Sequence, residues 1–318
     1  MYERHPFPSV DDPFRKTAEE MGLRLKMLGL RNEEFTKKKI LDAGCGTGEY
    51  TCWFASRGND MTGIDLSLPS LELARKYGQR NGFGQIQFER QSVLDLQFPD
   101  NSFDLTYSMG VLHHTPDPYR GFQEIVRVTK PGGIVIVSVY NRFGRLPHNM
   151  RQKWINWLAG EDQDRRVQLA KIWFPKTCRQ LKARMRRDAD TILYDTFGIP
   201  HESQHTIGEL LRWFDKNNVE YMGAFGPATL RDNILALQQQ EYKKFEESLE
   251  AFPLAQKVGG MMSYVGGLLK NPGNDKQFVF TRPSGFSRGM VQLGWFILGF
   301  RFSIFSLSGR KGLKNMIT

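Results

Sequence analysis

The feature that most constrains the fold is a glycine-rich loop between a short apolar strand and a helix. It reads Asp42-Ala-Gly-Cys-Gly-Thr-Gly48 and follows Ile40-Leu41. Because glycine lacks a Cβ atom, a ligand can approach this backbone closely and the turn can take positive φ. The amides at the start of the next helix can then meet a polar or anionic group. The loop therefore predicts a ligand site at the end of the first strand of an α/β sheet.

A second acidic residue, Asp65, ends the next predicted strand, seventeen residues after Gly48. In dinucleotide-binding folds a carboxylate placed like this accepts the hydroxyls of a ribose. The glycines are spaced G-x-G-x-G, not G-x-G-x-x-G as in the pyrophosphate fingerprint. We therefore predict a nucleoside ligand without a pyrophosphate.

Residues 38–140 alternate between short apolar runs and helical stretches, and the run 134–139 is apolar on both faces. We predict a doubly wound, Rossmann-like α/β sheet, mostly parallel with an antiparallel last strand and with helices on both faces. The last two strands are expected at 219–225 and 276–281. Helical insertions and an apolar C-terminal helix complete the predicted fold.

Five segments resemble the successive motifs of class I S-adenosylmethionine-dependent methyltransferases with a type 11-like domain. They are ILDAGCGTG (40–48), GIDLS (63–67), FPDNSFD (98–104), GVLHHT (110–115) and RVTKPGG (127–133). The resemblance covers about residues 38–140. It implies S-adenosylmethionine as the cofactor and methyl transfer as the activity, by in-line displacement.

The resemblance also implies roles for individual residues. The methionine end of the cofactor is assigned to the loop residues and to the end of the fourth strand: Asp42, Gly44, Cys45, Gly46, Gly48, Met109 and Gly110. Asp65 is assigned to the ribose and Leu66 to the adenine. Ser92, followed by Val93, stands where many relatives carry an Asp that faces the adenine amino group, and Asp95 is an alternative partner.

A catalytic base is needed only if the acceptor must lose a proton. His113 and His114 lie just past the fourth strand, where open α/β sheets bind ligands, and are base candidates. His205 belongs to a second polar segment, 201–205, and is the third candidate. A structural role remains the alternative for all three, and Thr206 or Ser203 is expected to cap the helix that follows.

The net charge of +10 is concentrated in one place. Residues 142–187 hold thirteen Lys and Arg against three acidic residues, an excess of ten that equals the net charge of the whole chain. Arginines interleaved with tryptophans suit an anionic membrane surface or RNA. A solvated helical face is the plain alternative.

The apolar tail over 289–308 has Arg301 near its middle, which disfavours a membrane span. An interfacial or substrate-covering helix, or one buried in the domain or in a dimer, is expected instead. The three cysteines lack CxxC spacing, so we expect no disulfide framework and no metal site. The N-terminus lacks an apolar signal segment, and we predict a cytoplasmic protein, peripheral at the inner face of the membrane.

Five parts follow from these patterns. They are an N-terminal lid at 1–37, a cofactor-binding core at 38–141, a basic helical insertion at 142–205, the rest of the core at 206–282 with a helical insertion at 228–270, and the tail at 283–318. The leading hypothesis is a methyltransferase acting on a small-molecule or lipid-like acceptor. An RNA or protein methyltransferase that docks through the basic insertion and a non-catalytic cofactor-binding module are the alternatives.

Overall fold

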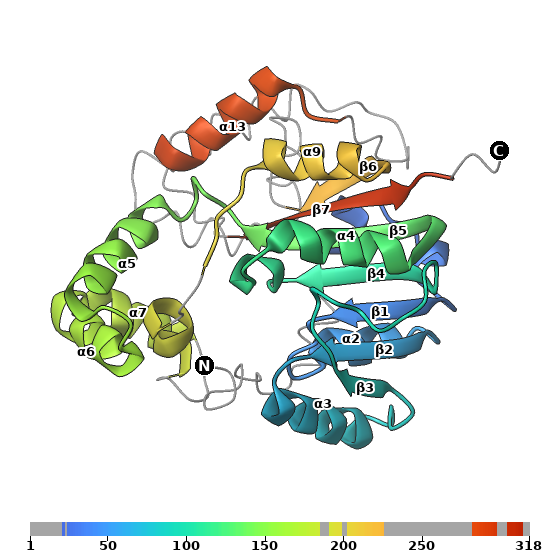
Figure 1. Ribbon diagram of the computed structural model, residues 1–318, viewed down its shortest axis with the longest axis horizontal. Helices are drawn as coiled ribbons and strands as arrows, with labels where there is room; N and C mark the ends of the chain where they lie inside the picture. The colour runs from blue at the N-terminus through green and yellow to red at the C-terminus, as the bar shows by residue number, and fades with distance from the viewer. Residues whose placement is uncertain are drawn as a thin grey trace, which may run out of the picture.

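The structure is a computed structural model that describes residues 21–22, 24–184, 191–198, 202–225, 282–297 and 304–313. Its centre is a seven-stranded sheet in the order β3-β2-β1-β4-β5-β7-β6 (Figure 1). The strands are β1 Lys39–Ala43, β2 Asp60–Asp65, β3 Gln87–Arg90, β4 Phe103–Met109, β5 Thr129–Tyr140, β6 Val219–Phe225 and β7 Ile304–Lys311. Pairs among β1 to β5 are parallel, and β7 is antiparallel to both neighbours. The predicted Rossmann-like sheet with an antiparallel last strand is confirmed.

Helices follow the strands in the alternation that the sequence predicts. Their bounds are α2 Glu49–Ala55, α3 Leu68–Arg80, α4 Pro118–Val128, α5 Leu146–Ala159, α6 Gln163–Trp173, α7 Pro175–Arg184, α8 Thr191–Leu193, α9 Ile207–Lys216 and α13 Gly285–Ile297. Side-chain caps start several of them, as at α3, where Ser67 accepts from the amide of Ser70. The Thr206 hydroxyl accepts from the amide of Glu209 and caps α9, so of the two predicted caps Thr206 is confirmed.

The sheet is covered on both faces because neighbouring strand residues point to opposite sides. On β1, Leu41 joins the core that contains α4 and α9, whereas Ile40 joins the core that contains α2 and α3. The second core also includes the N-terminal residues Met21, Leu25 and Leu28. Figure 1 shows α4 and α9 in front of the sheet. The result is the three-layer arrangement of a doubly wound fold.

A lobe of helices α5 to α8 lies beside the ends of the parallel strands, at the left of Figure 1. It has a small core of its own, which includes Ile155, Val167, Ala170 and Phe197. These helices confirm the predicted helical character of the basic stretch after β5.

The tail over 289–308 is not one helix, and that prediction is wrong over residues 304–308. The chain forms α13 and then β7, which pairs with β5 on one side and β6 on the other. Phe305 and Leu307 point into the α4–α9 core, while Ser306 and Ser308 alternate with them along the strand and are also buried. This alternation is that of a strand buried in the middle of a sheet. No helix in the part of the chain that the structure describes is long and apolar enough to cross a bilayer.

Three other predicted elements lie outside the described residues. They are the expected strand at 276–281, the helical insertion at 228–270 and most of the N-terminal lid predicted at 1–37.

The strand order places a switch point between β1 and β4. From β1 the chain builds outward through β2 to β3, and then returns to add β4 and β5 on the other side. Ligands of open α/β sheets bind outside the carboxyl ends of the strands at such a point. The glycine loop follows β1 and Gly110 follows β4, so both lie at the switch point.

Candidate functional site

The glycine loop has the backbone that its sequence requires. Gly44, Gly46 and Gly48 have positive φ, of 102°, 51° and 85°. A Cβ atom on Gly44 would lie 2.2 Å from Cγ2 of Val111, so only glycine fits there. A Cβ atom on Gly46 would meet no atom within 4 Å. Gly46 therefore borders open space at the carboxyl end of β1, as a ligand cradle requires.

Asp65 fixes the loop from the neighbouring strand. One carboxylate oxygen accepts from the amide of Gly46 at 3.0 Å, and the other accepts from the amide of Ser67 at 2.9 Å. The side chain is half-buried at the end of β2, and the adjacent Leu66 is 59% exposed. The structure thus places Asp65 and Leu66 beside the glycine loop, where the sequence predicts contacts to ribose and adenine.

Asp42 points into the protein and not into the open space at the loop. Its carboxylate accepts from the Thr51 hydroxyl at 2.6 Å and from the Tyr107 hydroxyl at 2.7 Å. Burial raises the pKa of Asp42 from 3.8 to about 7, against the lowering effect of these two hydrogen bonds. Burial also raises the pKa of the Cys45 thiol well above its ordinary value. The Asp42 side chain therefore holds the loop in shape, and the loop offers a ligand its backbone.

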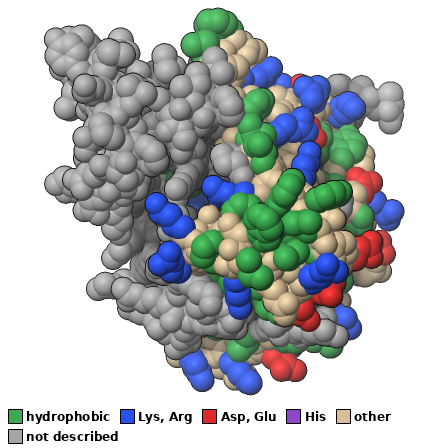
Figure 2. Space-filling view, turned by 90° about the vertical axis from the view of Figure 1, so that its left-hand side faces the viewer, with side chains coloured by type: hydrophobic (Ala, Val, Ile, Leu, Met, Phe, Trp, Pro, Cys, Tyr) green, Lys and Arg blue, Asp and Glu red, His purple; other side chains and the backbone are tan. Residues whose placement is uncertain are grey.

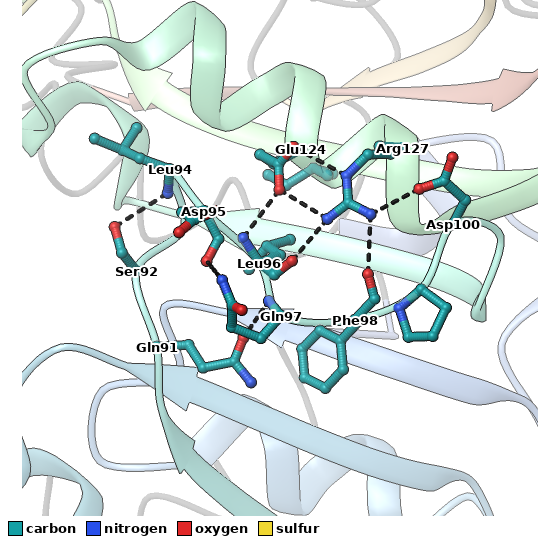
Figure 3. A network of polar contacts seen from close by, with 12 residues as sticks. Gln91, Ser92, Leu94, Asp95, Leu96, Gln97, Phe98, Asp100, Glu124 and Arg127 are labelled. Carbon is teal, nitrogen blue, oxygen red and sulfur yellow. Dashed lines mark hydrogen bonds and ion pairs between the residues drawn. The ribbon is translucent and has the colours of Figure 1, made fainter.

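Arg127 on α4 makes several of the contacts that hold the segment after β3 (Figure 3). Arg127 on α4 donates to the carbonyls of Leu96 and Phe98 and pairs with Glu124 and Asp100. At the start of this segment the Ser92 hydroxyl accepts from the amide of Leu94 at 3.2 Å, and its carbonyl accepts from the amide of Asp95.

The two predicted adenine contacts on this segment differ in burial. Ser92 is half-buried, whereas the Val93 side chain is 6% exposed and packs in the α4–α9 core. Ser92 therefore remains the better placed of the two to meet a ligand with its side chain.

The end of β4 forms the opposite wall of the open space. Gly110 has a φ of 81°, and a Cβ atom there would meet nothing within 4 Å. Met109 precedes it, and the Met109 sulfur lies 3.7 Å from a guanidinium nitrogen of Arg24. Gly46 and Gly110 thus leave room for a ligand at the ends of adjacent strands, β1 and β4.

His113 is fully buried and has no hydrogen-bond partner on either ring nitrogen among the described residues. Its ring lies 3.6 Å from the Tyr140 ring, and His114 is 5.3 Å from the same ring. Burial, with help from the nearby His114 and Arg145, keeps the pKa of His113 well below its ordinary value. The ring is therefore neutral at physiological pH, and one of its nitrogens is a hydrogen-bond acceptor.

Two other unsatisfied polar atoms belong to neighbours of Tyr140, the residue on which the His113 ring packs. Nδ2 of Asn141, a residue with no exposed surface, and Nε of Arg145 have no partner within the described ranges. The Arg145 guanidinium lies 3.6 Å from the Tyr140 ring centroid and pairs with the buried carboxylate of Glu202 at 2.9 Å. Buried polar groups are rarely left unpaired, so such a group of atoms is a candidate ligand site. We call His113, Tyr140, Asn141 and Arg145 the polar pocket.

His205 differs from His113 because both of its nitrogens are engaged. Nδ1 lies 2.9 Å from Oε1 of Glu209 and Nε2 lies 2.9 Å from the Ser203 hydroxyl. The amide of Ser203 in turn donates to the carbonyl of His113 at 2.8 Å. His205 therefore braces the segment that carries His113.

The structure brings the predicted cofactor residues together at the ends of β1, β2 and β4 and groups the predicted histidines at the ends of β4 and β5. Sequence reasoning missed Asn141 and Arg145, and it named Glu202 only as a residue that could reach the acceptor, not as the partner of Arg145. Asn141 carried one usable signal, since it directly follows the apolar run of β5 and so must lie at its carboxyl end. Arg145 and Glu202 are 57 residues apart and carried none.

The chain is similar to known methyltransferases. Residues 41–137 match the family model described as a methyltransferase domain. An uncharacterized protein of Synechococcus is 30% identical over 243 residues, which are 68% of this chain and 58% of that protein. A ubiquinone biosynthesis O-methyltransferase of Paracidovorax citrulli is 36% identical over 140 residues, 43% of this chain and 58% of the relative.

A solved S-adenosylmethionine-dependent methyltransferase from Mesorhizobium loti shares 18% identity and has a TM-score of 0.48, covering 93% of this chain and 99% of that one. The chain spans little more than half the length of the curated relatives named above.

Proposed function

Because the chain belongs to the class I S-adenosylmethionine-dependent methyltransferases, we propose that it methylates an oxygen atom of a small-molecule or lipid-like acceptor. The observation that carries this proposal is the polar pocket beside Gly110. An acceptor hydroxyl bound there would meet the partners that its buried polar atoms lack. The name O-methyltransferase of a 36% identical relative supports oxygen as the acceptor atom.

The residues present fit the cofactor. Gly46 and Gly110 leave open space at the carboxyl ends of β1 and β4, and Asp65 presents a half-buried carboxylate beside Gly46. The loop would hold the methionine end, Asp65 the ribose, and Leu66 with Ser92 the adenine. When bound, the cofactor supplies an electrophilic methyl group whose reactivity is its own. The protein has to place the acceptor in line and exclude water.

The polar pocket can orient an acceptor hydroxyl. The neutral His113 ring can accept the hydroxyl proton in a hydrogen bond, and Nδ2 of Asn141 can donate to the oxygen. Because Glu202 balances the charge of Arg145 and the neutral His113 is a weak base, the site suits an acidic acceptor hydroxyl, such as that of a phenol or enol. His205 acts here as a positioning residue, through Ser203, and the half-buried His114 ring lies 4.2 Å from that of His113.

The basic helices after β5 favour a second candidate function, methylation of RNA or of a protein that docks on them. The lipid-like acceptor is preferred because the unsatisfied atoms of His113, Asn141 and Arg145 are buried and so suit a small acceptor group better than a macromolecular surface. A lipid-like acceptor also accords with a cytoplasmic protein located peripherally at the inner face of the membrane.

The test is transfer of a labelled methyl group to lipid, phenol or quinol, and RNA fractions. We expect label in the phenolic lipid fraction. Asp65→Ala should weaken cofactor binding by roughly a hundredfold, because two amide partners and the ribose contact are lost. Asp60→Ala, at the exposed start of the same strand, should bind normally and serves as the control.

A further variant separates the acceptor pocket from the cofactor site. Asn141→Asp keeps the Oδ1 atom that accepts from the amide of Phe143 but removes the Nδ2 donor. We expect unchanged cofactor binding and a loss of kcat/KM for the acceptor of roughly tenfold or more. Label confined to RNA, or normal cofactor binding by Asp65→Ala, would contradict the proposal.

A further inference from the structure

Helices α5 and α6 carry a cluster of exposed apolar side chains. Met150, Trp154, Trp157, Ile172 and Trp173 are 66%, 48%, 75%, 70% and 56% exposed, and we call them the aromatic patch. The Trp154 ring lies 5.6 Å from that of Trp157 and 6.5 Å from that of Trp173, so the three rings form one surface. Contiguous exposed apolar surface of this kind marks an interaction site.

The core of the helical lobe does not require these side chains. On α5 the buried residues Gln152, Ile155 and Ala159 face the lobe, and Ile155 packs with Val167 of α6. Positions 150, 154 and 157 recur at a spacing of four and three residues and therefore lie on the opposite face of the same helix. Helix α5 is thus apolar on two faces, and only one of them has a partner among the residues the structure describes.

Positive charge lies close to the aromatic patch. Lys153, Lys171 and Lys176 are exposed on the same helices and on α7, as is Arg165. Three acidic residues, Glu161, Asp162 and Asp164, lie at the turn between α5 and α6, where Asp162 caps α6. Figure 2 looks onto this side of the molecule and shows a group of hydrophobic side chains with Lys and Arg around it and Asp and Glu along its right-hand edge. The surface therefore combines apolar and cationic character.

We propose that the aromatic patch docks the protein on an anionic lipid surface. Tryptophan prefers the boundary between headgroups and acyl chains, and basic side chains add attraction to anionic headgroups. The isoleucine and the methionine favour lipid over RNA, because these side chains bury in acyl chains but offer no flat ring for a base to stack on.

The docking surface is joined directly to the polar pocket. Asn141 and Arg145 lie immediately before α5, which carries the first three residues of the aromatic patch. Docking through α5 would bring the pocket close to a lipid-like acceptor held in the membrane. This inference rests on the proposed membrane location, but its test needs neither cofactor nor acceptor.

The test is co-sedimentation of the full chain with vesicles. One set contains phosphatidylcholine alone and the other equal amounts of phosphatidylcholine and phosphatidylglycerol. We expect binding to the anionic vesicles, weaker binding to the neutral ones, and a loss of roughly tenfold or more for the double variant Trp157→Ser and Ile172→Ser. Lys153→Gln with Lys171→Gln should weaken binding to the anionic vesicles alone.

Matched variants on other surfaces serve as controls. Phe286→Ser removes an 80% exposed aromatic residue at α13, and Lys76→Gln removes an exposed lysine on α3; both should bind as the unaltered chain does. Circular dichroism and cofactor binding report whether each variant is folded. The proposal is overturned if the chain ignores both vesicles, if the patch variants sediment unchanged, or if the aromatic patch mediates dimer formation or RNA binding without lipid binding. Absence of methyl transfer with normal vesicle binding would overturn only the proposed function.

Discussion

Among single residues, buried polar side chains with partners differ in role from those without. Asp42 has two hydroxyl donors and holds the glycine loop, whereas His113 and Nδ2 of Asn141 have none within the described chain. Unpaired buried groups cost stability and persist where a ligand completes them. The sequence marks Asp42 and His113 equally well as functional candidates, and only their surroundings separate a structural carboxylate from a ligand-facing ring.

Asp42 gives a pH-dependent prediction. Its pKa is raised to about 7 in the folded chain, so between its unfolded value of 3.8 and about 7 the folded state binds more protons than the unfolded state. The contribution of Asp42 to the free energy of unfolding therefore declines as the pH rises through this window and is constant above it. Asn at this position can accept both hydrogen bonds and carries no charge.

We expect Asp42→Asn to gain roughly 1–3 kcal/mol over the unaltered cofactor-free chain as the pH rises from about 4 to about 8. Urea unfolding of both proteins across this range measures the difference. A difference that is flat with pH, or that grows toward acid, would show that the buried carboxylate stays ionised.

At the scale of elements, the segment 91–100 is irregular but is fixed by α4. The Arg127 guanidinium donates to two carbonyls and two carboxylates, and it lowers the pKa of Glu124. Lysine cannot reproduce this fork of donors. We expect Arg127→Lys to lower the free energy of unfolding by about 1–3 kcal/mol and to weaken cofactor binding, since Ser92 lies on the same segment.

Urea unfolding and amide hydrogen exchange measure the effect, with faster exchange expected in 91–100. Arg75→Ala is the control, because Arg75 donates to a single carbonyl, that of Phe88, outside the segment. An equal loss in both variants would mean that Arg127 is an ordinary surface arginine.

The elements also show what local sequence can predict. β5 is recognisable from its continuous apolar run, and the glycine loop from its spacing, because both signals lie within about ten residues. β7 was missed because its Phe-Ser-Leu-Ser alternation is short and adjoins the apolar residues of α13, so the whole stretch resembled one helix. The cofactor residues lie in contiguous motifs and were predictable. The polar pocket was not, because Ser203 meets His113 across 90 residues.

For the molecule as a whole, β7 joins the two ends of the chain. It completes the sheet between β5 and β6, its Ser308 hydroxyl donates to the carbonyl of Leu28, and its Arg310 pairs with Glu34. The N-terminal residues Met21, Leu25 and Leu28 in turn pack on the same sheet. The sheet that holds the glycine loop therefore cannot close before residues 304–311 are in place, which gives the fold a high contact order.

Gly309 tests this closure. A Cβ atom there would lie 2.5 Å from Cγ1 of Val219 and 2.7 Å from the carbonyl oxygen of Glu220, and the backbone of β6 cannot move aside without breaking its pairing with β7. We expect Gly309→Ala to lower the free energy of unfolding by about 1–3 kcal/mol in a single urea transition seen alike by circular dichroism and tryptophan fluorescence.

Gly289→Ala is the control. It lies in the exposed middle of α13 with no atom within 4 Å of the new Cβ, so it should instead raise the free energy of unfolding by about 0.5–1 kcal/mol. If Gly309→Ala split the unfolding into two transitions, β6 and β7 would form a unit separate from the cofactor-binding strands, and the ends of the chain would not be needed to close the site.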